Sequence, residues 1–141
     1  MDYFYVQPEV AGELGANTVM DSTVHPPRVD RLHYQFTGWL GDVLLESFPC
    51  FIATEGAKEK LQFEGLTGVR FGEVEISTAR PFNELYPERE LPRFVWIRIE
   101  GKPSEDDFGI ASDARLVVSE RALKVLKHLG IAHAIINEYP G

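Results

Sequence analysis

Residues 116–138 read LVVSERALKVLKHLGIAHAIINE, which predicts a strand, a helix and a second strand in close succession. The first three residues are apolar and mostly β-branched, as is typical of a short buried strand. Ser119 is placed to cap a helix over 120–129, because its side-chain oxygen can accept a hydrogen bond from the first helical turn. Gly130 ends that helix, and residues 131–138 return as a strand. This segment favours the α+β class.

The rest of the chain extends the same mixed pattern. Residues 94–99, FVWIRI, are apolar at nearly every position and predict a central strand buried on both faces. The other expected elements are strands over 3–7, 32–36 and 50–54, a helix over 55–64, and one helical turn over 81–86. Residues 43–46 fit either a strand or a short helix.

Three segments are less regular. Residues 9–31 contain several glycines and prolines without clear periodicity, which predicts a long loop. Residues 101–109 are expected to form a polar loop. Val69 and Phe71 share one strand phase while Val74 and Ile76 share the opposite one, which predicts a bulge near Gly72 within a bent strand or hairpin.

The size and composition of the chain fit a single domain spanning residues 1–141. Its hydrophobic fraction of 44% and charged fraction of 26% are globular averages. No internal repeat or linker divides it. We therefore expect one compact α+β domain with a mixed or antiparallel sheet and two main helices.

The compartment is inferred from what the sequence lacks. Cys50 is the only cysteine, so no disulfide can form within the chain. The first residues show neither the basic segment nor the apolar run of a signal peptide. No stretch approaches the roughly 20 apolar residues that a membrane span requires. These features predict a cytoplasmic protein.

The charge distribution predicts the sign of the net charge of a binding partner. The chain has 22 acidic and 14 basic residues, a net charge of −8. Residues 1–57 hold eight carboxylates against two arginines, an excess of six. Such a field repels nucleic acid and membranes and attracts basic proteins. The alternative is that the acidity serves solubility alone.

Metal and cofactor sites are not expected. The histidines His25, His33, His128 and His133 lack the close pairing with each other, or with cysteine, that zinc sites show. His128 is interpreted as a cation at a helix end, and His33 as lying on the exposed face of a strand. No glycine motif is spaced to hold a phosphate.

No residue shows a catalytic signature. Cys50 lies among apolar neighbours with no charged group to lower its pKa, which indicates a small buried hydrophobe. Ser119 lacks the flanking glycines of a nucleophile elbow, and its role as a cap already accounts for it. We therefore expect no catalytic residues.

Two segments are candidates for contact with a protein partner. The run Glu105-Asp106-Asp107 could pair with a basic surface, although it also fits a solvated loop or a weak cation site. Trp39, framed by glycines and close to Asp42, could anchor a partner. Its alternative role is a lid over the local core.

The C-terminal part resembles a known kind of protein. The residues that carry the resemblance are Asp106-Asp107-Phe108-Gly109, Asp113, and the stretches LVVSERAL over 116–123 and LGI over 129–131. They are similar to the closing strand–helix–strand of immunity proteins of bacterial polymorphic toxin systems, including one group known only as a domain of unknown function. The resemblance implies a compact α+β protein that binds and neutralises a cognate toxin in the cytoplasm without a cofactor. The matching positions are structural, so no functional residue is carried over.

Three functions follow as hypotheses. The first is an immunity-type inhibitor that presents an acidic face to a basic toxin. The second is an enzyme whose site is assembled from distant loops, with Glu73, Glu75, His33 and residues 105–107 as its material. The third is an adaptor or assembly subunit that works through a hydrophobic patch or an exposed edge strand, such as the C-terminal strand. The sequence does not predict an oligomeric state.

Overall fold

The centre of the fold is an antiparallel sheet in the order β6-β7-β10-β8. Its strands are β6 (Leu44–Ser47), β7 (Cys50–Thr54), β10 (Phe94–Ile99) and β8 (Val69–Gly72). Strand β10 has a partner on each side, as its apolar sequence predicts. The ambiguous segment near residue 44 is a strand.

This central sheet is buried on both faces. Successive side chains of a strand point to opposite faces, and neighbouring residues accordingly enter different clusters. Leu44 and Phe51 belong to one hydrophobic core, whereas Leu45 and Ile52 belong to another. The fold therefore has two cores, with the central sheet between them.

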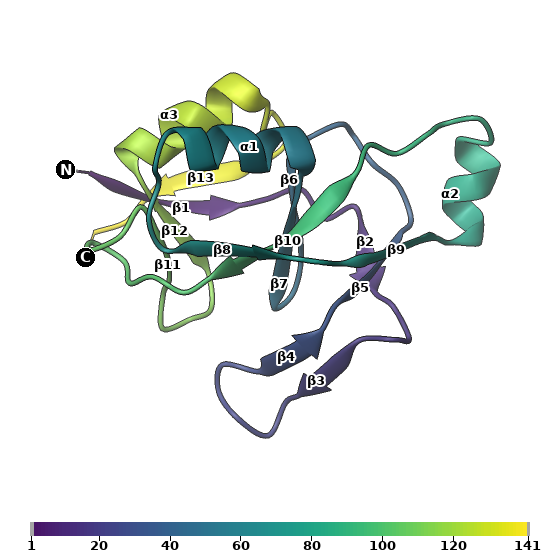
Figure 1. The fold of residues 1–141 in the computed structure, drawn as a ribbon, viewed down its shortest axis with the longest axis horizontal. Helices are drawn as coiled ribbons and strands as arrows, with labels where there is room; N and C mark the ends of the chain where they lie inside the picture. The colour runs from purple at the N-terminus through teal and green to yellow at the C-terminus, as the bar shows by residue number, and fades with distance from the viewer. Residues whose placement is uncertain (1, 141) are drawn as a thin grey trace.

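The first core is enclosed by a second antiparallel sheet and two helices (Figure 1). The strand order is β11-β12-β1-β13, with bounds Phe108–Ile110, Leu116–Ser119, Tyr3–Gln7 and Ile135–Glu138. The helices are α1 (Glu55–Phe63) and α3 (Glu120–Leu129). Strand β1 lies between β12 and β13, so β13 is an edge strand.

The helix caps follow from the sequence. The Oγ atom of Ser119 accepts a hydrogen bond from the backbone N–H of Ala122 at 3.1 Å, as predicted. Thr54 does the same for Ala57 at the start of α1. These bonds satisfy backbone donors that the first helical turn leaves without partners.

The second core lies on the other face of the central sheet. It is covered by the sheet β2-β5-β9, with bounds Gly12–Leu14, His33–Phe36 and Glu75–Thr78, and by the short helix α2 (Arg80–Leu85). Aromatic rings fill much of it: Phe36 lies 5.2 Å from Phe94 and 6.2 Å from Phe82 between ring centroids. Strands β5 and β9 are parallel, which makes this sheet mixed.

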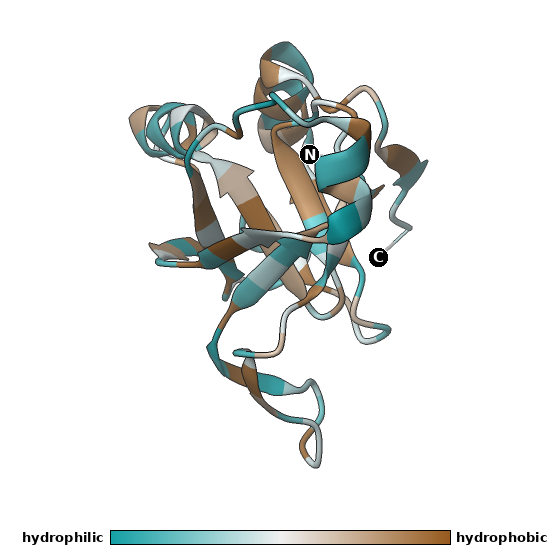
Figure 2. Ribbon diagram, turned by 90° about the vertical axis from the view of Figure 1, so that its right-hand side faces the viewer, coloured by the Kyte–Doolittle hydropathy of each residue, from teal (hydrophilic) through white to brown (hydrophobic). Residues whose placement is uncertain are grey.

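A two-stranded hairpin, β3 (Val19–Asp21) and β4 (Arg28–Arg31), projects from this body (Figure 2). The long loop predicted over residues 9–31 is therefore wrong in part, because β2, β3 and β4 lie within it. These strands have three or four residues and are largely exposed. Strands that bury no continuous face leave no alternating pattern to detect.

The predicted bulge at Gly72 is also wrong. Strand β8 ends at Gly72 and pairs with β10, whereas β9 leaves that sheet and pairs with β5. The change of phase marks a passage from the first core to the second. In the same way, the predicted loop over 101–109 contains the start of β11, and the last strand begins at Ile135, not at residue 131.

The computed structural model describes residues 2–140, and these form one compact α+β domain, which confirms the predicted fold class. Its sheets are antiparallel or mixed, and its two longer helices are the two expected ones. Within residues 2–140, every helix falls short of the length and apolar character that crossing a bilayer demands.

Candidate functional site

Trp39 lies over the second core and is half-buried. Its ring packs edge-on against Phe94, with 5.7 Å between centroids, and its Nε1–H donates to the carbonyl of Asp42 at 3.0 Å. The guanidinium of Arg89 lies 4.6 Å from the indole centroid and also donates to the Trp39 carbonyl. These contacts fit the second of the two roles considered for Trp39, a lid over the core, and not that of a partner anchor.

Asp42 is buried, and its carboxylate accepts two hydrogen bonds from His133. The backbone N–H of His133 lies 2.8 Å from Oδ2, and the ring Nδ1 lies 2.9 Å from Oδ1. A carboxylate only accepts, so Nδ1 carries the proton. Asp42 is therefore engaged inside the protein and presents no charge at the surface.

Glu9 joins this pair from a third segment. Its carboxylate accepts from the backbone N–H of Leu40 at 2.6 Å and of Asp42 at 3.3 Å. Potential ligand atoms of Glu9, Asp42 and His133 lie within 4.8 Å of one another. The donor types would suit a divalent metal, but a cation there would compete with hydrogen bonds that already engage each of them. The three residues act as a clasp between distant segments.

The clasp leaves one histidine nitrogen available. Because Nδ1 is held by Asp42, Nε2 is the basic atom of the neutral ring. The His133 side chain is partly exposed and borders a hollow of about 570 Å³ that also touches Glu46 and Arg115. We call this hollow the His133 pocket. Its walls include the exposed apolar side chains Val10, Leu40 and Ile135.

Two of the titratable groups that line the His133 pocket have shifted pKa values. The hydrogen bond to Asp42 raises the pKa of His133, and burial raises the pKa of Glu46. A carboxylic acid and an imidazole beside an arginine are the components of proton-transfer sites. The sequence analysis missed this grouping because the residues lie on three distant segments, and local spacing carries no signal of it.

The residues named for an assembled enzyme site are brought together only in part. The His33 ring Nε2 lies 2.7 Å from Ser77 Oγ and 3.8 Å from a Glu75 oxygen. Its Nδ1 accepts the backbone N–H of Asn17 at 3.2 Å, so Nε2 carries the proton in the neutral ring. A protonated Nε2 cannot take a proton from Ser77, so this pair is not an activated nucleophile.

His33 itself differs from its predicted setting. It is buried, not on an exposed strand face as predicted. A Cβ atom at Gly15 would lie 2.1 Å from His33 Nδ1, so the glycine lets the loop pack onto the imidazole. This close packing is the physical reason for the burial.

Asp107 is the centre of a second internal network. Its carboxylate accepts from Ser119 Oγ at 2.6 Å, from Arg121 Nη2 at 2.7 Å and from the backbone N–H of Thr67 at 2.9 Å. Burial opposes its ionisation, but these donors lower its pKa to about 2. Asp107 thereby fixes the start of α3 to the loop before β8, and it is not a surface charge.

The other two residues of the acidic run, Glu105 and Asp106, differ in their exposure. Asp106 is half-buried and accepts the backbone N–H of Lys102 at 2.9 Å, which closes the turn before β11. Glu105 alone of the three is fully exposed. The structure therefore separates the predicted contact residues: Trp39 and Asp42 lie in one region and residues 105–107 in another.

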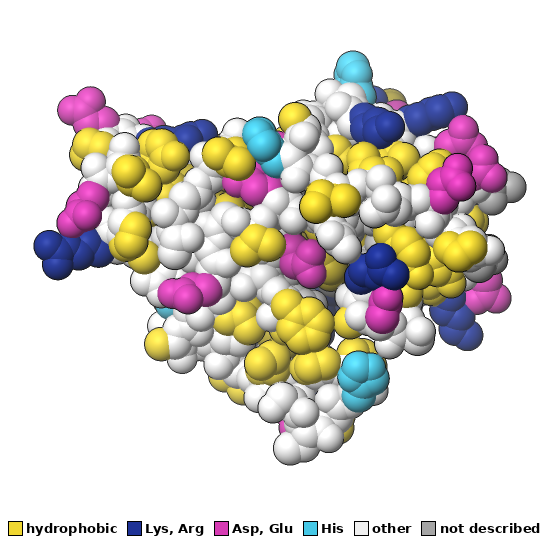
Figure 3. All heavy atoms as spheres, turned by 180° about the vertical axis from the view of Figure 1, so that it is seen from behind, with side chains coloured by type: hydrophobic (Ala, Val, Ile, Leu, Met, Phe, Trp, Pro, Cys, Tyr) yellow, Lys and Arg dark blue, Asp and Glu magenta, His cyan; other side chains and the backbone are white. Residues whose placement is uncertain are grey.

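The projecting hairpin carries a different kind of surface. Val19, Met20 and Val24 are 53%, 40% and 44% exposed, and Phe48 in the β6–β7 turn is 58% exposed. Pro26 of the hairpin and Pro49 of that turn border one hollow, so the two segments are neighbours. We call these four side chains the hairpin patch. Figure 3 shows hydrophobic side chains gathered over this projecting end of the molecule.

Comparison with known proteins adds no relative. No protein-family model matches the chain, and no curated protein matches its sequence.

Proposed function

We propose that this protein is a cytoplasmic, immunity-type inhibitor that neutralises a cognate basic toxin by direct binding. The observation that supports this most is the hairpin patch. Two-stranded hairpins are marginally stable alone, and exposed clusters of large apolar side chains mark interaction sites. A partner that covers these side chains would remove apolar surface from water and so stabilise the complex.

The charge of the chain supports a basic partner. The net charge of −8 attracts cationic proteins at long range and accelerates their encounter. The burial of Glu9 and Asp42 removes two carboxylates from the local surface excess, and Glu55 is paired with Arg93 at 3.0 Å. The attraction therefore comes from the field of the whole molecule, while apolar contact at the hairpin holds the complex. This mode of action uses no cofactor, nucleic acid or membrane.

The first test is whether a large modular secreted toxin is encoded directly upstream of this protein. The C-terminal domain of that toxin is then the one to use. Co-expression of this protein should restore growth of cells that produce the domain, and the two should elute together in size-exclusion chromatography. Absence of both rescue and complex would remove the immunity function.

Matched variants then locate the surface. The double substitution Met20→Ser and Phe48→Ser should weaken the complex by at least about 2 kcal/mol, the loss expected for apolar side chains at the centre of an interface. Phe63→Ser is the control, because Phe63 is 82% exposed on α1, outside the hairpin. Equal affinity of the two variants would place the interface elsewhere.

The His133 pocket favours a second candidate function, an acid–base enzyme acting on an anionic small molecule. His133 and Glu46 would transfer protons, and Arg115, which pairs with Asp113 at 2.7 Å, would exchange that partner for the anion. The test is hydrolysis of a panel of esters and phosphodiesters by the wild type, Glu46→Gln and His133→Gln. A bell-shaped pH profile that each variant abolishes would establish this function, and turnover unaffected by both substitutions would reject it.

A further inference from the structure

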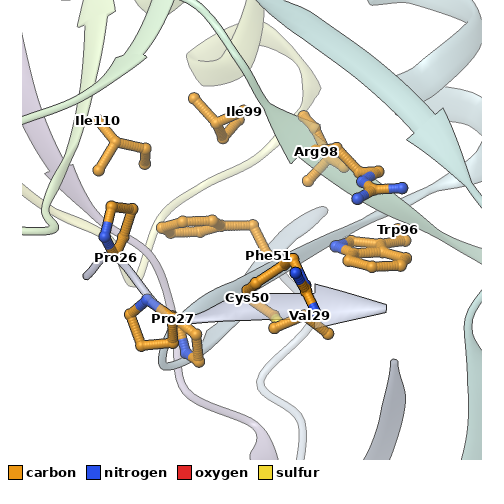
Figure 4. A pocket seen from close by; sticks show the side chains of 12 residues that line it. Pro26, Pro27, Val29, Cys50, Phe51, Trp96, Arg98, Ile99 and Ile110 are labelled. Carbon is orange, nitrogen blue, oxygen red and sulfur yellow. The ribbon is translucent and has the colours of Figure 1, made fainter. Parts of the chain in front are cut away.

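A second hollow lies where the hairpin meets the central sheet. Its volume is about 310 Å³, at the lower end of the range of roughly 300–1,000 Å³ that small-molecule sites occupy. Figure 4 shows Pro26 and Pro27 on one side and Trp96 with Arg98 on the other. The remaining walls are mostly apolar and include Phe51 and three isoleucines. We call it the Arg98 pocket.

Arg98 differs from the other arginines of the protein. Its guanidinium lies 4.3 Å from the Trp96 ring centroid, and among residues 2–140 it has no carboxylate or carbonyl partner. Every other arginine pairs with a carboxylate or donates to a backbone carbonyl.

The neighbouring strand adds a second positive group. Arg98 and Arg70 lie directly opposite each other in the β10–β8 register. Like charges in that position destabilise a sheet, and only Arg70 is neutralised, by Glu100 at 2.8 Å. Arg28 lines the pocket from the hairpin side and pairs with exposed Asp30. Arg70 does not line the hollow, and Arg28 already has a carboxylate partner, so Arg98 is the lining arginine that an anion can use.

An apolar hollow beside one free guanidinium indicates the chemical class of the ligand. We infer that the Arg98 pocket binds a small amphipathic carboxylate, with its hydrocarbon part among the prolines and Phe51 and its carboxylate on Arg98. Arginine holds carboxylates through two parallel N–H···O bonds. Stacking on an indole fixes the orientation of the guanidinium plane, which favours these two bonds. This inference goes beyond toxin binding and does not depend on it.

Octanoate is the probe, and octanol and octylammonium are its comparisons. Trp96 lines the pocket, and the chain has two tryptophans, so a Trp39→Phe background makes Trp96 the sole fluorescent reporter. Octanoate should change Trp96 fluorescence with saturation and bind about tenfold more tightly than octanol, as one charge-assisted hydrogen-bond pair implies. Octylammonium should bind more weakly than octanol.

Variants in the same background decide the role of Arg98. Arg98→Gln should reduce octanoate affinity to that of octanol, while Arg98→Lys should keep part of the preference. Arg93→Gln is the control, because Arg93 is an exposed arginine that pairs with Glu55 outside the pocket. Absence of octanoate binding at millimolar concentration, binding without a Trp96 signal, equal affinity for octanol, or an unchanged preference in Arg98→Gln would each overturn the inference.

Discussion

Asp42 and His133 are 91 positions apart in the chain, yet two hydrogen bonds of 2.8 and 2.9 Å join them. The carboxylate of Asp42 is buried, whereas the imidazole reaches the surface. The contact ties the segment after β5 to the segment before β13 and orients the ring whose Nε2 borders the His133 pocket. The same contact therefore stabilises the fold and positions a candidate catalytic side chain.

Asp42→Asn should lower the pKa of His133 towards its ordinary value of about 6.5. The carboxylate is the main reason that this pKa is raised, through its hydrogen bond and its charge. NMR titration of the imidazole resonances measures the shift, with His25 and His128 as internal references. A His133 pKa that does not change in the variant would contradict the described contact.

The same contact sets a pH dependence of stability. A raised pKa in the folded state means that the stabilisation is fully present below about pH 6.5 and is lost as the pH rises through the folded-state pKa. Urea unfolding from pH 6 to 9 should therefore show a decline in the wild type that His133→Gln lacks. Parallel curves for the two proteins would mean that the pair contributes nothing to this dependence.

Asp107 predicts the opposite dependence, at acid pH. Its pKa of about 2 in the folded state lies below its ordinary value of about 3.9, so its contribution is present above about pH 4 and is lost as the pH falls towards 2. Asp107→Asn should cost about 1–2 kcal/mol at pH 7, a moderate value because Arg121 is half-exposed. Glu105→Gln, its exposed neighbour, should stay within about 0.5 kcal/mol of the wild type.

Cys50 should be unreactive in the folded protein. Burial raises the pKa of its thiol to about 12, so almost no thiolate is present at pH 8. Iodoacetamide should alkylate it at least about a hundredfold more slowly in buffer than in concentrated urea. Mass spectrometry of the quenched samples follows the reaction. Equal rates in the two conditions would show that the site opens freely.

Two glycines should respond in opposite directions to substitution by alanine. A Cβ at Gly12 would lie 2.0 Å from the Gln35 carbonyl oxygen, so Gly12→Ala should cost about 2–3 kcal/mol. Gly56 lies in the first turn of α1 with open space around it, so Gly56→Ala should add about 0.5–1 kcal/mol. Chemical denaturation measures both. Destabilisation of equal size at the two positions would disagree with the close approach at Gly12.

Parts of the fold that bury a continuous face could be predicted from the sequence. The run over 94–99 is apolar because both neighbours of β10 and both cores enclose it. The capped helix α3 was predicted correctly because a cap and an amphipathic face are local signals. The hairpin and β2 were missed because their residues bury little, and the ladder bonds that form them leave no pattern in composition.

The candidate sites were less predictable for a different reason. Asp42 and Asp107 were expected to present surface charge, but each is buried among donors from segments far away in the sequence. Nothing in the local sequence marks Glu46 or Arg115 as a site residue. They line the same hollow as His133 only because of the order of the strands in the fold. The number of charged residues can be counted from a sequence, but the fold decides which of them are buried and paired and which remain exposed.

The position of β1 has a consequence for how the chain folds. Residues 3–7 pair with residues 116–119 and 135–138, over a hundred positions away along the chain. The first core stays incomplete until these distant segments meet. Pairings of such long sequence separation form slowly, so we expect the insertion of β1 between β12 and β13 to be a late step when the unfolded protein refolds.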